Sequence, residues 1–171
     1  MKAWHFLHSS GALRYGDGRR PEVGRKLRCA VHKVRMCEYG FHGSVKALDA
    51  LGYAPGPIAC RVEMGGFIKC GCDKVVASER TILKMIDATK ILDKFARLCA
   101  LDVVHLWDAP EVVVRYLKCG EEREEAYDAA DDAYAAAANT AAAYAARAEY
   151  TVDKQNQRLV RMLNKGFRDG R

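Results

Sequence analysis

Apolar and polar residues alternate with a period of two in several short stretches of the first 90 residues. The clearest stretch places four side chains on one face, those of Ile58, Cys60, Val62 and Met64. This period is typical of a half-buried strand. Further segments with strand character lie at residues 2–7, 12–16, 32–37, 67–70, 74–78 and 81–87. Asp17-Gly18 and Gly65-Gly66 are typical of hairpin turns, so the strands are expected to form a mainly antiparallel sheet.

Three other segments repeat their apolar positions every three to four residues, which indicates helices. The first begins near Ser44, a preferred N-cap residue, and ends at Gly52. The second covers residues 88–101. The third has Asp108 as its expected N-cap and Gly120 just beyond its end. These elements predict an α+β globular domain over residues 1–120, with a small sheet and two or three helices.

Alanine then dominates the chain between residues 126 and 150. Alanine is the best helix former, and the glutamates at 121–125 favour a helix N-terminus. Residues 121–171 are therefore expected to form a helical arm. It is either one helix of about 45 residues or a hairpin that turns at Asn139-Thr140. Its small side chains allow close contact with a second copy, and Tyr134 and Tyr144 are expected to contact a partner.

Charge changes sign twice along the chain. Residues 1–120 hold 20 Lys and Arg against 12 Asp and Glu, residues 121–150 hold 2 against 8, and residues 151–171 hold 6 against 2. One stripe of the last segment is basic: Arg158, Arg161, Lys165 and Arg168. These side chains are predicted to bind a partner, with contact to nucleic-acid phosphates as one form. The alternative is a solvated surface whose charges pair with the acidic segment.

The stretch "CEYGFHGS" holds the residue types of a reactive site. Cys37 with His42 can make a nucleophile pair. In the alternative, His42 and Ser44 satisfy backbone groups at a turn that enters a helix. Cys70 and Cys72 do not have the spacing of common zinc sites, so no metal is expected. No cofactor is expected either.

Nowhere do 18 apolar residues run together, and the N-terminal segment lacks a signal-peptide pattern. The protein is therefore expected to make no membrane contact and to act inside the cell. The seven cysteines are expected to be reduced thiols.

Several segments together carry a resemblance: "LRYGDGR", "CEYGFHGSVKALDALGYAPG", "CRVEMGG", the alanine-rich array and "QNQRLVRML". This combination resembles an uncharacterised family carried mainly by bacteriophages and prophages, in which a C-x-x-G-[FL]-H-x-S-like box precedes an alanine-rich tail. The resemblance implies a phage accessory protein that acts by binding in the cytoplasm of the infected bacterium. The first expectation is an inhibitor of a host defence complex, of anti-CRISPR or other anti-defence type, with a host protein or ribonucleoprotein as partner.

Two other functions stay open. The order of the "GFHGS" turn, the following helix and the "CRVEMGG" strand is similar to ADP-ribosyltransferase-like folds, which implies an enzyme that binds NAD or a nucleotide. Glu63 and Glu79 are the residues that would be tried as its catalytic glutamate. The third alternative is a structural component of the virion.

Overall fold

A computed structural model describes residues 1–15, 17–137 and 152–170, and of residues 132–137 it describes the backbone alone. Contacts divide the chain into two compact units. The first, called the sheet unit here, contains Met1–Thr89 and Leu159–Arg171. The second, called the helical unit, contains Lys90–Arg158. Each unit is described by itself.

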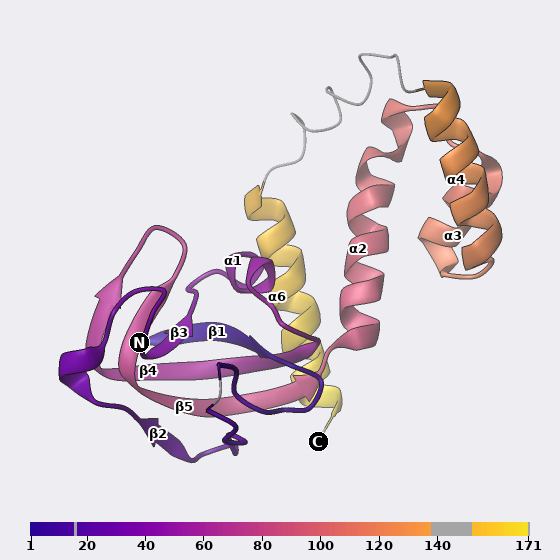
Figure 1. Cartoon of the computed structure of the whole chain (residues 1–171). Coiled ribbons are helices and arrows are strands. Elements are labelled where there is room, and N and C mark those ends of the chain that lie inside the picture. Colours follow the sequence, from indigo (N-terminus) through magenta and orange to yellow (C-terminus); the bar gives the residue numbers. More distant parts are fainter. Residues whose placement is uncertain (16, 138–151, 171) are drawn as a thin grey trace. The chain divides into compact units, whose positions relative to one another are not determined.

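The sheet unit is built on a five-stranded antiparallel sheet (Figure 1). Four strands lie in the order β1 (Lys2–Leu7), β4 (Ile58–Cys70), β5 (Val75–Asp87) and β2 (Lys26–Arg28). The fifth strand, β3 (Phe41–Gly43), also pairs with β5. Together with the helices, this sheet confirms the α+β class with a mainly antiparallel sheet.

The strands β4 and β5 are longer than the sequence pattern predicted. The expected hairpin turn at Gly65-Gly66 was wrong, because residues 58–70 form one strand with a register shift between Gly65 and Ile68. At this bulge Gly66 has a φ of 65°, and the Phe67 N–H donates to Ser78 Oγ at 2.9 Å. The bulge therefore absorbs the two glycines without ending the strand.

Three local expectations in the first half of the sheet unit's sequence were also wrong. The helix α1 covers Ala47–Gly52 and has Lys46 as its N-cap, without a side-chain cap hydrogen bond, so Ser44 does not cap it. Ser44 instead exchanges two backbone hydrogen bonds with Trp4, of 2.7 and 2.9 Å. Of the strand expected at residues 12–16, the described residues 12–15 are part of a loop, in which the Leu13 N–H donates to the Arg19 carbonyl at 2.9 Å. The short helix η1 (Val31–Lys33) interrupts the third expected strand.

The chain's last helix supplies part of the sheet unit's core. The helix α6 covers Val152–Asp169, and its residues from Leu159 onward belong to this unit. Leu159 and Leu163 are fully buried, and the ring of Phe167 stacks on Trp4 with 6.2 Å between centroids. One face of the sheet therefore buries an apolar stripe of α6.

The helical unit contains α2 (Thr89–Val103) from Lys90 onward, η2 (Val104–Leu106), α3 (Glu111–Cys119) and α4 (Arg123–Ala137). The helix α3 has Pro110 rather than Asp108 as its N-cap and ends at Gly120 with a φ of 87°. Its buried residues Val113, Tyr116 and Leu117 pack against Ala126 of α4. The small Ala126 side chain lets the two helices approach closely.

The helical arm can be described only in part. Its helices α4 and α6 are present, whereas Asn139, Thr140 and Tyr144 lie outside the described residues, as does the side chain of Tyr134. The choice between one long helix and a hairpin, and the domain boundary at residue 120, stay predictions. None of the helices described has the length and apolar character needed to cross a bilayer.

Candidate functional site

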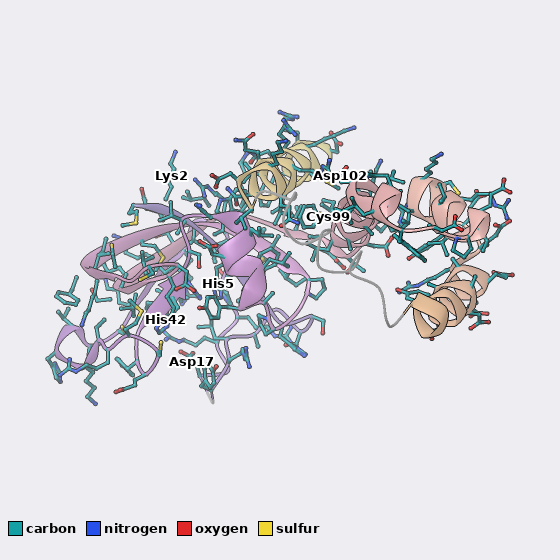
Figure 2. The ribbon with its side chains drawn as sticks, turned by 90° about the horizontal axis from the view of Figure 1, so that it is seen from above. Lys2, His5, Asp17, His42, Cys99 and Asp102 are labelled. Atoms are coloured by element: carbon teal, nitrogen blue, oxygen red, sulfur yellow. The ribbon has the colours of Figure 1, made fainter. Side chains whose placement is uncertain are left out.

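The sheet unit holds a cavity of about 330 Å³. Its walls come from β1, β3, β5, residues 12–15, Asp17, the turn before β3, the end of α1 and Lys74. His5 pairs with Cys60 across β1 and β4, and Arg80 pairs with Met64 across β5 and β4. Because residues opposite each other share a face, His5 and Arg80 lie on the face that carries the main apolar cluster. Figure 2 labels His5, His42 and Asp17, which all line the cavity.

Arg80 is the central side chain of this cavity. It is 2% exposed, and its Nη1 donates to the His42 carbonyl oxygen at 3.0 Å. Its Nε is buried and has no hydrogen-bond partner. Burial lowers the pKa of Arg80 to about 10, so the side chain is cationic at neutral pH. Asp17 is a carboxylate that interacts electrostatically with Arg80, but no ion pair joins Arg80 to a carboxylate within the described residues. A buried cation that is not in an ion pair is costly.

His42 uses its ring to hold the turn before β3. Its Nε2 accepts a hydrogen bond from the Cys37 backbone N–H at 3.0 Å, and a further hydrogen bond joins the ring to the Gly40 backbone. With Nε2 as an acceptor, the proton of the neutral ring lies on Nδ1. Cys37 itself has a left-handed φ of 67°. The ring is thus engaged with backbone groups rather than placed to activate the Cys37 thiol as a nucleophile.

Ser44 follows β3 and is 1% exposed. Cys37, His42 and Ser44, which were singled out together from the sequence, all line the cavity. The structure therefore brings them to one site, where the backbone of Ser44 is tied to Trp4.

His5 contributes a second imidazole to the wall. Burial lowers its pKa well below the usual value, and the positive charge of Arg80 and the ring of His42 act in the same direction. The ring is therefore neutral at pH 7. An anion bound beside the His5 ring would make protonation of His5 less unfavourable. It would also reduce the cost of burying the charge of Arg80.

The rim of the cavity combines aromatic and charged groups. The Tyr53 hydroxyl donates to Asp73, and Lys74 Nζ lies 4.3 Å from the centre of the Tyr53 ring. On another segment, the guanidinium of Arg14 lies 5.0 Å from the Tyr15 ring. Asp17 is engaged by Arg19, whose Nε donates to it at 2.6 Å. That contact holds the pKa of Asp17 below its usual value.

The predicted basic stripe lies on the single helix α6, whose residues are divided between the two units. Arg158 belongs to the helical unit, where it donates to the Leu98 carbonyl at 3.1 Å and pairs with Asp102 at 2.7 Å. Arg161, Lys165 and Arg168 are exposed on the part of α6 that belongs to the sheet unit. Their role in binding a partner stays a prediction.

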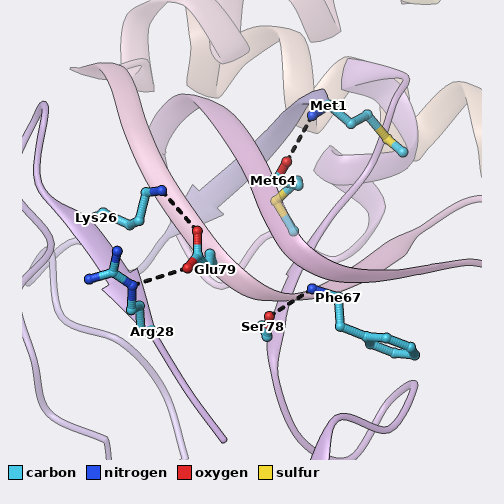
Figure 3. A network of polar contacts seen from close by, with 7 residues as sticks. All are labelled: Met1, Lys26, Arg28, Met64, Phe67, Ser78 and Glu79. Atoms are coloured by element: carbon cyan, nitrogen blue, oxygen red, sulfur yellow. Dashed lines mark hydrogen bonds and ion pairs between the residues drawn. The ribbon is translucent and has the colours of Figure 1, made fainter. Parts of the chain in front are cut away.

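The two glutamates considered for catalysis lie away from the large cavity. Glu63 and Glu79 line a separate cavity of about 140 Å³ together with Lys26. Glu79 accepts hydrogen bonds from Lys26 at 2.8 Å and from Arg28 at 3.0 Å (Figure 3). The carboxylates on the wall of the large cavity are Asp17 and Glu38. Among the described residues, no cluster of His, Cys, Asp and Glu is arranged to hold a metal ion.

Sequence reasoning missed Arg80. The predicted strands ended at residue 78 and resumed at residue 81, so Arg80 fell between them. A signal was present, because Arg80 stands two positions before Ile82 and four after Val76, at the period of two that a strand face requires. A charged residue at an inward position of a strand indicates a buried functional group.

Residues 13–94 match a family described as Domain of unknown function (DUF7666). The matched segment includes Arg80, His42 and the cavity wall between them, but not β1. No curated protein matches the chain, and no solved structure matches it. The family description names no activity, so the inference about function rests on the geometry of the cavity.

Proposed function

We propose that this protein binds a small anionic molecule of the nucleotide class in the cavity around Arg80. The observation that carries the proposal is the buried guanidinium of Arg80, which lines the cavity with its Nε unpartnered. A phosphate or other anion there would supply the missing acceptor and compensate the buried charge. Arginine suits this role because its planar donors match phosphate oxygens.

The volume of the cavity and its other wall residues also suit a nucleotide. A volume of about 330 Å³ lies within the usual range for small-molecule sites. Arg14 and Lys74 add positive charge to the wall, whereas Tyr15 and Tyr53 offer aromatic faces at its rim. The phosphate of a bound nucleotide would contact the cationic side chains near Arg80, and its planar base would stack on a tyrosine ring.

The biological role follows from the resemblance to phage proteins and is part of the proposal. A protein that captures a nucleotide would interfere with a nucleotide-signalled defence in the cytoplasm of an infected bacterium. The cavity favours this form of anti-defence activity over one that requires only a protein surface. An ADP-ribosyltransferase-like enzyme is the second candidate, favoured by the same cavity. Because Glu63 and Glu79 lie elsewhere, its catalytic group would be Asp17 or Glu38.

The test measures ligand binding by isothermal titration calorimetry with inorganic phosphate, adenosine and guanosine monophosphates, cyclic dinucleotides and NAD. Arg80→Met should lower the affinity of every nucleotide that binds by at least tenfold, since a hydrogen bond to a charged group contributes about 1.5–3 kcal/mol. Arg61→Met is the matched control, because Arg61 also has a buried guanidinium nitrogen without a hydrogen-bond partner but does not line the cavity. Its guanidinium lies 4.6 Å from the centre of the Trp4 ring. No binding of any of these anions to the unmodified protein would overturn the proposal.

A further inference from the structure

Eight basic side chains lie between residues 14 and 35, and all are exposed. They form what is called the basic band here: Arg14, Arg19, Arg20, Arg25, Lys26, Arg28, Lys33 and Arg35. Asp17 and Glu22 are the acidic residues of the same stretch. The band therefore carries a large excess of positive charge within one short part of the sheet unit.

The fold places the middle of the band at the end of the sheet. The strand β2 is the last in the order β1-β4-β5-β2, and it buries Leu27 while it exposes Lys26 and Arg28. Both of these cations bind Glu79 of the neighbouring strand (Figure 3). The alternation of the strand thus fixes two cations on the same side.

Carboxylates of the described residues neutralise only part of the band. Asp17 pairs with Arg19 at 2.6 Å, and Glu22 pairs with Arg25 at 3.5 Å. Glu79 is shared by two cations. Within the described ranges, four members of the band form no ion pair: Arg14, Arg20, Lys33 and Arg35. Exposed cations without ion-pair partners, clustered in one short stretch of sequence, favour a polyanionic partner.

Exposed aromatic rings accompany these cations. Tyr15 is 94% exposed next to Arg14, and both residues line the wall of the large cavity. Tyr39 is 41% exposed and exchanges backbone hydrogen bonds of 2.9 and 3.0 Å with Arg35. Cations that alternate with exposed rings are the arrangement that binds single-stranded nucleic acid, because unpaired bases stack on the rings.

We propose that the basic band binds the backbone of a single-stranded nucleic acid and leads one nucleotide of the strand to the cavity. The second part rests on the proposed function, since the cavity must accept a nucleotide. The band reaches the cavity through Arg14 and Tyr15. A base enters such a cavity only when it is unpaired, which is why a single strand fits better than a duplex.

The experiment measures fluorescence anisotropy of a labelled 12-nucleotide oligothymidylate over a range of salt concentrations. The unmodified protein should bind it, and the affinity should fall steeply as salt rises. The variant Arg20→Glu, Lys33→Glu, Arg35→Glu should bind at least roughly tenfold more weakly, because phosphate contacts dominate such affinity. Its slope of log affinity against log salt should be smaller by about 2, from about 0.7 per phosphate contact.

The matched control reverses three exposed lysines of the helical unit: Lys90→Glu, Lys94→Glu and Lys118→Glu. It changes net charge by the same amount and should keep the salt slope. Equal weakening in both variants would overturn the proposal, because binding would then follow net charge alone. Equal or tighter binding of a duplex of the same length would overturn it as well.

Different results would overturn the cavity proposal and the basic-band proposal. The band variant should still bind a mononucleotide as the unmodified protein does, whereas Arg80→Met should lose the mononucleotide and keep most of the salt-dependent strand binding. If the oligonucleotide binds and no mononucleotide does, the band stands and the cavity proposal fails. If mononucleotides bind and the oligonucleotide does not, the band proposal fails alone.

Discussion

Arg80 Nη1 donates to the backbone carbonyl oxygen of His42 at 3.0 Å. This hydrogen bond links a buried cation of β5 to the residue that holds the turn at Cys37, since the His42 ring accepts from the Cys37 backbone N–H. A ligand that contacts Arg80 would therefore also act on the geometry of that turn. Arg80, His42 and the Cys37 backbone thus form one chain of hydrogen bonds on the cavity wall.

Arg80→Met should leave the free energy of unfolding unchanged or raise it by about 1–4 kcal/mol, because a buried charge that is not in an ion pair is replaced by an apolar side chain of similar length. The measurement is urea-induced unfolding without ligand. The lost bond to the His42 carbonyl opposes the gain by about 1 kcal/mol. A loss of 3 kcal/mol or more would mean that Arg80 is mainly a structural residue.

The protein should lose stability as the pH falls below about 6.5. The pKa of His5 is lowered in the folded state by burial and by Arg80, so the unfolded chain binds the proton more readily. The stability is then fully present above the unfolded pKa and falls with decreasing pH, by up to about 1.4 kcal/mol per unit for one histidine.

Denaturant unfolding between pH 5 and pH 7.5 checks this dependence. His5→Asn should make the slope smaller, whereas His8→Asn, at an exposed position, should keep it. An unchanged slope in His5→Asn would assign the dependence to other groups, and His42 would be the next to test because burial also lowers its pKa.

Gly66→Ala should destabilise the protein by about 1–3 kcal/mol. Gly66 has a φ of 65°, and a Cβ atom there would collide with Ser78 Oγ, which accepts the hydrogen bond that closes the bulge. Gly52→Ala is the control, since no atom other than those of the adjacent residues and the backbone of α1 lies within 4 Å of the added carbon. Thermal unfolding compares the two variants, and equal melting temperatures would show that the bulge relaxes freely.

Phe167→Ala should cost about 3–5 kcal/mol, because the ring is 4% exposed and stacks on Trp4. Arg168→Ala, at the exposed neighbouring position, should change the stability by less than about 0.5 kcal/mol. Chemical denaturation of the full chain measures both. A small effect of Phe167→Ala would mean that α6 is an appendage of the sheet unit and would favour a folded domain of residues 1–120.

The secondary structure was largely accessible from the sequence. The alternation of Ile58, Cys60, Val62 and Met64 predicted a strand, and the helix before Gly120 ended as expected. These features depend on local periodicity and on a glycine that adopts a positive φ, which neighbouring residues determine almost alone. The α+β class follows from the same patterns.

Other features needed the tertiary structure. Gly65-Gly66 has the composition of a hairpin turn, and only the pairing of β4 with β5 across the bulge made it part of one long strand. Ser44 has the chemistry of an N-cap, but its backbone hydrogen bonds with Trp4 keep it in an extended segment. Long-range pairing overrides such local preferences because it satisfies backbone groups over the whole strand.

The residues of the candidate site were likewise predictable only in part from the sequence. The sequence alone selected Cys37, His42 and Ser44 as a group, because they lie close together along the chain. It could not connect them with His5 or Arg80, which are far away in sequence and meet them only through strand register. Nor could it show that Arg158 pairs with Asp102, because helical spacing does not reveal a partner on another helix. Local composition thus determined which residues were available, and long-range packing decided which of them share a site.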